Sequence, residues 1–448
     1  MTRRVDRLFA WLARFVLGVF FRRVEVVGSE RLPSKGPLVV VANHLNGLID
    51  PLFLLGTLRL PVRFLGKSTL WRIPVLGFLL RQAQAIPVYR RQDPGVDPER
   101  NLETFARCHE LLAAGGMIAL FPEGVSHDEP GLQPLKTGAA RIALESEQRF
   151  GPLGVRILPV GLTFSAKTRF RSRALVVVGE PIDPEPERRA ATSDPAAAAR
   201  ALTARIDEGL RRVTLNHETW EEARLVERAA DLFRAAEDGL PASRALADEF
   251  RLQQALLAGS ESLAPRHPGR LAALAEAVAG YDRLLRVAGV RDEHVAAAYP
   301  LGEVAAFVAR SLAAMLLRLP VALVGAVANV VPYQLARLAS SWVRDEADQI
   351  STYKVYPSLL LYPATWIAEA VAMGHAAGPW AGLATLLLAP ATGWVALRTF
   401  EDQLRLARET RVFLLLHTRR GLWRELRGRR EAIRQELAAL AHELDADG

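Results

Sequence analysis

The stretch Val39-Val40-Val41-Ala42-Asn43-His44-Leu45-Asn46-Gly47-Leu48-Ile49-Asp50-Pro51 joins a β-branched apolar run to a histidine and an acid. A short, continuous apolar run is typical of a strand buried on both faces, as in a parallel sheet. Ligands of open α/β sheets bind at the carboxyl ends of such strands. His44 is therefore a candidate general base, and Asp50 could hold its imidazole in one tautomer.

Short apolar runs continue to alternate with helical stretches as far as residue 184, followed by a proline-rich break. This alternation predicts an α/β domain with a mainly parallel sheet over residues 25–185. The predicted strands are 38–42, 62–65, 84–88, 117–121, 155–160 and 174–178, and the predicted helices are 51–58, 98–114 and 136–147.

Length, composition and charge limit which classes of protein the chain can belong to. The chain has 448 residues, which is too long for one ordinary core, and half of them are apolar. Cys108 is the sole cysteine, so an intrachain disulfide and a thiolate metal cluster are both excluded. The net charge of +8 fits either nucleic acid or anionic lipid. Aromatic and basic residues are not interleaved in the way that stacks bases, so we expect no nucleic-acid partner.

The first residues predict an amphipathic helix lying in a membrane interface, over residues 1–24. Apolar residues recur there at helical spacing, with Arg3, Arg7 and Arg14 on the opposite side. No small-residue cleavage site follows, and Arg14 interrupts a run already short for a span. The alternative is a helix that docks on the core of the protein itself.

Residues 186–311 are rich in Ala, Leu, Glu and Arg and predict a helical region. Residues 312–400 predict membrane-embedded segments. Runs 355–374 and 380–397 would form a transmembrane hairpin around Gly378-Pro379, and run 319–336 would be re-entrant or lie flat. The alternative is a hydrophobic helix pair inside a soluble domain.

The Arg-rich residues 401–448 predict a basic tail helix on the cytoplasmic side of the membrane. Two crossings would return the tail to the side of the α/β domain. With the high Ala and Arg content, this predicts a bacterial inner (cytoplasmic) membrane protein whose catalytic domain faces the cytoplasm.

Four blocks of sequence carry a family resemblance. Asn43-His44 through Asp50 is the first, and the others are Ile86-Pro87-Val88-Tyr89-Arg90, Phe121-Pro122-Glu123-Gly124 and Ile157-Leu158-Pro159-Val160-Gly161. In this order they resemble the glycerolipid acyltransferase family, which includes lysophosphatidic acid and glycerol-3-phosphate acyltransferases.

The chain departs from that family pattern at two places. Five residues separate His44 from Asp50, where most members have four, and Val125-Ser126-His127 stands where most continue Thr-Arg-Ser. Both departures, with the run Leu135 to Arg141, are similar to the subgroup of fungal glycerol-3-phosphate acyltransferases.

The resemblance implies a membrane-bound enzyme of phospholipid biosynthesis. It would transfer a fatty acyl group from acyl-CoA or acyl carrier protein to a hydroxyl of 1-acyl-glycerol 3-phosphate or glycerol 3-phosphate. His44 would be the general base and Asp50 its partner. The thioester is a co-substrate, and neither a cofactor nor a metal is expected, although His44, Asp50, Glu123 and His127 are also of metal-binding type.

The resemblance also implies which residues bind the phosphate-bearing acceptor. Arg90 would bind the phosphate. Neighbouring Arg91 is the alternative ligand, because strand alternation turns only one of the two inward. Within the block Phe121, Pro122, Glu123 and Gly124, the acid would bind acceptor hydroxyls and the glycine would allow close backbone approach. Lys136 would add positive charge.

Structural roles would also explain these residues one by one. Asp50-Pro51 is a common helix start, and Arg90 could simply pair with Asp93. A second class of function is therefore a lipid-binding or membrane-scaffold protein without turnover, and a third is an acyltransferase for another lipid acceptor. Whether Asp50 lies within hydrogen-bonding distance of His44 discriminates between enzyme and scaffold.

Overall fold

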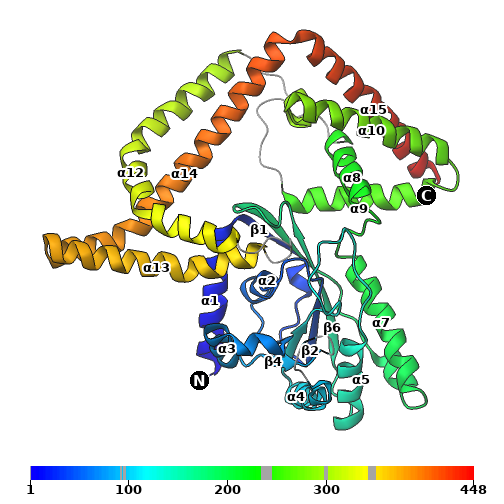
Figure 1. The fold of residues 1–448 in the computed structure, drawn as a ribbon. Helices are drawn as coiled ribbons and strands as arrows, with labels where there is room; N and C mark the ends of the chain where they lie inside the picture. Colours follow the sequence, from blue (N-terminus) through cyan, green and yellow to red (C-terminus); the bar gives the residue numbers. More distant parts are fainter. Residues whose placement is uncertain are drawn as a thin grey trace. The chain divides into compact units, whose positions relative to one another are not determined.

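The computed structural model describes residues 2–90, 93, 97–233, 245–296, 301–341 and 350–447 (Figure 1). The chain divides into two compact units. The first comprises Met1–Trp220, Ala245–Ala247 and Arg344–Val355, and the second comprises Glu221–Arg244, Asp248–Val343 and Tyr356–Gly448.

The first unit contains a seven-stranded sheet in the order β1-β7-β6-β2-β5-β3-β4 among the described residues. All neighbouring pairs are parallel except β6 and β7. The predicted α/β class with a mainly parallel sheet is confirmed. The strands are β1 (Phe21–Val27), β2 (Leu38–Ala42), β3 (Val62–Lys67), β4 (Ile86–Val88), β5 (Met117–Leu120), β6 (Arg156–Phe164) and β7 (Ser172–Val178).

Strand β2 lies in the middle of this sheet, and all five of its residues are buried. Burial on both faces explains why its sequence is a continuous apolar run rather than an alternating one. Its register aligns Val41 with Leu120 of β5 and with Pro159 of β6. The segments that follow β2 and β5 therefore begin side by side at one edge of the sheet.

Helices cover both faces of the sheet, as right-handed crossovers between parallel strands require. Figure 1 shows α2 and α7 on opposite sides of the strands. The helices of this unit are α1 (Thr2–Phe20), α2 (Ile49–Leu58), α3 (Pro74–Gln82), α4 (Asn101–Ala113), α5 (Gly138–Phe150), α6 (Glu185–Ala190) and α7 (Pro195–Arg211).

Helix α1 is shorter than the predicted 1–24, because it ends at Phe20 and β1 begins at Phe21. Its last turns dock on the domain: Ala13, Val16 and Leu17 are buried, and Leu17 contacts α2 at Gly56. Its outer face exposes apolar side chains, namely Leu8, Trp11, Leu12 and Phe15. The helix therefore combines core docking with an apolar surface.

The second unit is helical and has its own core. Tyr281, Leu285 and Leu426 are among the buried residues that form it. The helices are α8 (Trp220–Phe233), α9 (Leu246–Leu263), α10 (Pro268–Ala288), α11 (Asp292–Ala296), α12 (Leu301–Ser341), α13 (Ile350–Ala377), α14 (Pro379–Thr418) and α15 (Arg420–Asp447). The first residues of α8, α9 and α13 belong to the first unit.

Two helical segments among the described residues are long and apolar enough to cross a membrane, judged by length and composition: Val304–Leu338 and Pro379–Leu415. The second contains the predicted run 380–397. The other predicted span, 355–374, is not one of the two; it lies in α13, which carries Pro357 and Pro363. Run 319–336, predicted to be re-entrant or to lie flat, is part of the continuous helix α12.

The two apolar helices α12 and α14 pack closely and could form a hairpin. Gly325 lies so near Thr392 that a Cβ on Gly325 would be 2.0 Å from the Thr392 carbonyl oxygen. The Asn329 amide donates to the Ala389 carbonyl over 3.2 Å and accepts from Trp366 Nε1 over 2.9 Å, which ties α12 to α14 and α13. Small residues and single polar groups of this kind join helices in apolar surroundings. Helix α14 runs on to Thr418, so the predicted tail boundary at residue 401 falls inside it.

Candidate active site

His44 and Asp50 form a hydrogen-bonded pair at the carboxyl end of β2. Nδ1 of His44 lies 2.9 Å from Oδ2 of Asp50, and the Asp50 side chain is completely buried. An ionised carboxylate only accepts, so the Nδ1 hydrogen points to Asp50 and Nε2 carries a lone pair. None of the described residues hydrogen-bonds Nε2. The five-residue spacing therefore does not prevent the contact that a base and its orienting acid require.

Two neighbours hold the His44 ring in place. The Asn43 side chain exchanges two hydrogen bonds with the Leu162 backbone, 3.0 Å and 2.7 Å long, and so joins the end of β2 to β6. The His44 ring stacks on Phe121, with ring centres 4.1 Å apart and planes 13° from parallel. Phe121, predicted as part of the acceptor block, thus packs against the base.

Asp50 lies in the first turn of α2, but it is not the residue that begins the helix. That position belongs to Leu48, and no side chain caps it. Asp50 Oδ2 instead accepts from the Asn46 backbone N–H over 2.8 Å, in addition to His44. Its Oδ1 is buried without a protein partner. The simple helix-start explanation of Asp50 is therefore wrong.

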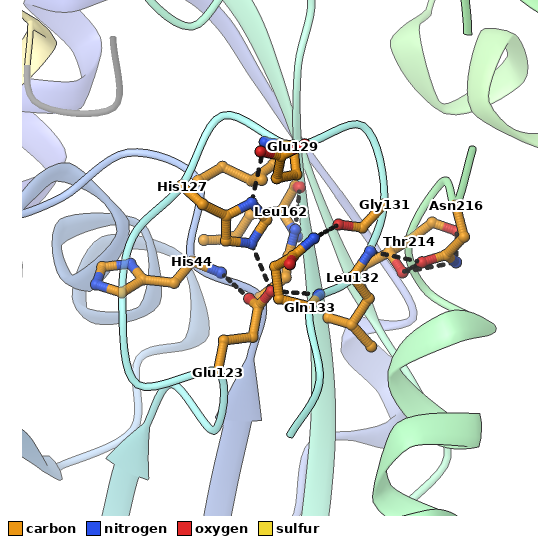
Figure 2. A network of polar contacts seen from close by, with 12 residues as sticks. His44, Glu123, His127, Glu129, Gly131, Leu132, Gln133, Leu162, Thr214 and Asn216 are labelled. Carbon is orange, nitrogen blue, oxygen red and sulfur yellow. Dashed lines mark hydrogen bonds and ion pairs between the residues drawn. The ribbon is translucent and has the colours of Figure 1, made fainter. Parts of the chain in front are cut away.

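Glu123 is buried and fully occupied by the protein. Oε1 accepts from the His44 backbone N–H over 2.7 Å, and Oε2 accepts from the Gln133 N–H over 2.8 Å. His127 Nε2 lies 2.5 Å from Oε2, and the Glu123 side chain is 0% exposed. Figure 2 shows the His44 ring pointing away from this carboxylate. The structure thus gives Glu123 a different set of partners from the predicted acceptor hydroxyls.

Arg90 lies beside the same loop and pairs with Asp93. Nε and Nη2 donate to the two Asp93 oxygens over 3.1 and 3.0 Å, and Nη1 donates to the Gly124 carbonyl over 2.9 Å. Burial tends to raise the pKa of Asp93, but the hydrogen bonds and charge of Arg90, together with Lys67, outweigh it and lower that pKa. A guanidinium has five N–H groups, so two remain for a ligand. Arg91 lies outside the described residues.

Lys136 lies across Gly124. The Lys136 N–H donates to the Pro122 carbonyl over 2.8 Å, which brings its side chain over the turn. Gly124 has φ +76°, and a Cβ there would be 2.6 Å from Lys136 Nζ, so only glycine fits both the turn and the lysine. The predicted close approach at Gly124 is thus made by the Lys136 side chain.

Two further residues bind the loops of the site and were missed from the sequence. Lys167 Nζ donates to the Leu45 and His127 carbonyls, each over 3.0 Å. Thr352, in the first turn of α13, accepts from the Leu48 N–H over 3.2 Å. Both side chains form hydrogen bonds with backbone groups that are distant in the sequence. Such contacts cannot be recognised from a local sequence pattern.

Comparison with known families identifies both parts of the chain. Residues 23–163 match the Acyltransferase family, and residues 225–447 match the Glycerol-3-phosphate acyltransferase 2 C-terminal domain. The first match contains His44, Asp50, Arg90 and Glu123. The second covers most of the helical region, the apolar segments and the tail.

The chain is also similar to individual proteins. An uncharacterised acyltransferase of Schizosaccharomyces pombe is 26% identical over 64% of this chain and 54% of its own length. Glycerol-3-phosphate O-acyltransferase 1 of Saccharomyces cerevisiae is 26% identical over 50% and 41%. The crystal structure of the 1-acyl-sn-glycerophosphate acyltransferase of Thermotoga maritima is 22% identical, with a TM-score of 0.35, over 47% and 79%. The chain spans about half the length of the yeast relatives that it matches.

The predicted bacterial inner-membrane location is contradicted by these relatives. The yeast proteins point to eukaryotic membranes. The prediction depended on Ala and Arg content and on an assumed pair of spans, neither of which reports the compartment. The two family matches and the yeast relatives together give the identity: the chain belongs to the glycerolipid acyltransferase family.

Proposed function

We propose that this protein transfers a fatty acyl group from a thioester, acyl-CoA or acyl carrier protein, to a hydroxyl of glycerol 3-phosphate. The observation that carries the proposal is the His44–Asp50 pair, 2.9 Å apart, with Nε2 unpartnered among the described residues. The match of residues 225–447 to a glycerol-3-phosphate acyltransferase domain favours this acceptor over 1-acyl-glycerol 3-phosphate, which stays the second candidate.

The geometry suits direct transfer without an acyl-enzyme. His44 Nε2 takes the hydroxyl proton while the oxygen attacks the thioester carbonyl carbon. The tetrahedral intermediate then expels the thiolate, which receives that proton from the imidazolium. The products are an ester and a free thiol. Buried Asp50 stabilises the imidazolium between the two proton transfers.

The positive groups near Gly124 supply a place for the acceptor phosphate. Arg90 keeps two N–H groups after its contacts with Asp93 and Gly124, and Asp93 fixes its plane. A pre-oriented guanidinium is suited to two hydrogen bonds with a phosphate. The Lys136 ammonium, held across Gly124, adds a second charge.

A membrane is the proposed surrounding of the enzyme, because its acyl substrates partition there. The outer face of α1 exposes Trp11 and Phe15, which suits a helix at the lipid interface. The apolar segments Val304–Leu338 and Pro379–Leu415 provide a second, deeper attachment. No cofactor or metal is part of the proposal.

The test is acyl transfer by the full chain in membranes. Labelled acyl-CoA or acyl carrier protein is the donor, and glycerol 3-phosphate and 1-acyl-glycerol 3-phosphate are offered separately. We expect product with glycerol 3-phosphate, and a loss of about 10²- to 10⁴-fold in His44→Ala, the usual contribution of a general base. His267→Ala, at a partly exposed histidine of the second unit, is the matched control.

Three results would contradict the proposal. Product that persists in His44→Ala would overturn the mechanism. Product with 1-acyl-glycerol 3-phosphate alone would change the acceptor. Absence of product with both acceptors and both donors would favour the scaffold, or an enzyme for another lipid acceptor.

A further inference from the structure

We propose that His127 is a positioning residue for the base His44, and that it acts through the Glu123 carboxylate. This inference rests on the proposed function, since it concerns the same site. His127 belongs to the stretch Val125-Ser126-His127, where the chain departs from its family's usual sequence.

The hydrogen bonds fix which nitrogen of His127 carries the proton. The backbone N–H of Glu129 donates to Nδ1 of His127 over 3.1 Å, so Nδ1 is an acceptor and has no hydrogen. The proton of the neutral ring is therefore on Nε2, and Nε2 donates to Oε2 of Glu123. Figure 2 shows the ring between these two partners.

Glu123 depends on this donor because its carboxylate is buried. The side chain is 0% exposed, and its two oxygens share three donors: His127 Nε2, the Gln133 N–H and the His44 N–H. A buried charge that loses a hydrogen-bond partner pays a large desolvation cost. Without the His127 donor we expect the carboxylate to turn toward water and to release the His44 amide.

The same segment also binds the other side of the His44 peptide. The His127 backbone N–H donates to the His44 carbonyl over 3.1 Å, while Glu123 accepts from the His44 N–H over 2.7 Å. Lys167 then joins the Leu45 and His127 carbonyls. Both backbone polar groups of the base are thus bound by residues 123–127, so the Glu123–His127 contact controls where the His44 ring points.

A misplaced base slows the chemical step without weakening substrate binding. His127 touches the protein through both ring nitrogens, which leaves it no free group for the acceptor. We therefore expect His127→Leu to lower kcat roughly 10- to 100-fold, the range for an ångström-scale displacement of a catalytic group. The KM for glycerol 3-phosphate should stay within about twofold.

A conservative variant separates hydrogen bonding from packing. In His127→Gln the side-chain amide reaches about as far as Nε2 and can donate to Glu123. The exposed Glu129 N–H can bind water instead of Nδ1. We expect His127→Gln to recover most of the kcat that His127→Leu loses, while His267→Leu, the same change at a partly exposed histidine elsewhere, has no effect.

A double variant tests whether the effect passes through Glu123. If it does, His127→Leu should cause little further loss of kcat in a Glu123→Gln background, because groups in one network are not additive. Equal losses in both backgrounds would overturn the proposal. So would normal kcat in His127→Leu, a glutamine variant as impaired as the leucine variant, or a rise confined to KM.

Hydrogen exchange makes the test independent of turnover. In the unliganded full chain, His127→Leu should speed backbone exchange in residues 43–50, and His127→Gln should not. Unchanged exchange in both variants would overturn the positioning role even in an active enzyme. If His127→Leu shows the faster exchange but the wild-type protein forms no product, the positioning role stands and the proposed function is overturned.

Discussion

Two buried polar clusters differ in how completely they are satisfied. In the first unit, the cluster at the edge of the sheet contains His44, Asp50, Glu123 and His127, with several backbone N–H groups among its donors. In the second unit, the Asp292 carboxylate of α11 accepts a hydrogen bond from the Tyr281 hydroxyl of α10 over 2.8 Å. It also accepts two from the Arg430 guanidinium of α15, over 3.0 and 3.3 Å.

The second cluster is closed around Asp292, whereas the first has two atoms without a partner among the described residues: the buried Asp50 Oδ1 and the His44 Nε2. Both oxygens of Asp292 are bound by Arg430, and burial, followed by the Asp292 charge, raises the pKa of Tyr281 well above its usual value, so its hydroxyl remains a donor. At the sheet edge, His44 Nε2 has no partner among the described residues. The comparison indicates that the closed cluster stabilises helix packing, whereas the open one keeps a base available for substrate.

Asp50→Asn should have the largest effect on kcat, because it changes the proton position on His44 in the cluster at the sheet edge. An asparagine amide can donate to Nδ1 and so force the His44 proton onto Nε2, which removes the base. We expect kcat to fall by about 10⁴-fold, as when the acid of a catalytic triad is replaced by its amide. Steady-state acyl transfer at saturating glycerol 3-phosphate measures this. A loss below tenfold would mean that Asp50 only supports the local fold.

Asp292→Ala should affect stability rather than chemistry. It leaves the Arg430 guanidinium buried without a counter-charge, which usually costs about 3–5 kcal/mol. Faster hydrogen exchange in α10, α11 and α15 would show the loss of stability. Asp248→Ala, which breaks an exposed pair with Arg251, is the control and should cost less than about 1 kcal/mol. Unchanged exchange after Asp292→Ala would contradict a stabilising role for this network.

Arg90→Ala should weaken acceptor binding without slowing the chemical step, which would separate binding from catalysis at the sheet edge. Loss of a charge-assisted contact with phosphate, worth about 1.5–3 kcal/mol, should raise the KM for glycerol 3-phosphate roughly 10- to 100-fold. The KM for the thioester should hardly change. Titration of acceptor against donor separates the two constants, and an equal rise in both would argue for a purely structural pair with Asp93.

The pH dependence of Asp93 follows from the same pair. Its pKa is lowered in the folded chain, so the charged form stabilises the fold above the unfolded pKa, and this contribution is lost as the pH falls through the folded pKa. Protection of residues 86–90 against hydrogen exchange, relative to the intrinsic exchange rate at each pH, should therefore fall in that acidic range in the wild type. Asp93→Asn should lack this step, and a wild-type profile in Asp93→Asn would exclude the pair as its source.

Cys108 should show the smallest effect of all. It is fully buried in α4, and burial raises the pKa of its thiol to about 12. A thiol of this kind does not ionise near neutral pH, so a disulfide reagent at pH 8 should not label the native chain and should label it after denaturation. Rapid labelling without denaturant would show that α4 opens readily.

The central strand, which is buried on both faces, could be predicted from the sequence. The edge strand β1, which is defined by its pairing with a distant segment, could not. Residues 38–42 are predicted as a strand and form β2. The prediction succeeds because a strand that is buried on both faces has a continuous apolar sequence. Strand β1 was missed: its Arg22, Arg23 and Glu25 resemble the end of a polar helix, and its pairing with β7 comes from far along the chain.

In the site and in the apolar helices, too, features set by nearby residues could be predicted, and features set by distant partners could not. The His44–Asp50 contact followed from nearby residues, whereas the partner of Glu123 is a backbone N–H 79 positions away, which no local pattern reveals. Run 319–336 contains Pro320 and Pro332, and proline usually interrupts a helix. They lie within one helix, whose close packing against α14 depends on tertiary contacts.

The anchoring of His44 and Asp50 on different elements has an evolutionary consequence. The base follows a strand and the acid lies in the first turn of a helix, so residues 45–48 form a loop whose ends are held independently. A loop of this kind can gain or lose a residue while its two ends keep their places. The number of residues between histidine and aspartate is therefore free to drift among homologues, and a search that requires one fixed spacing would overlook working members of the family.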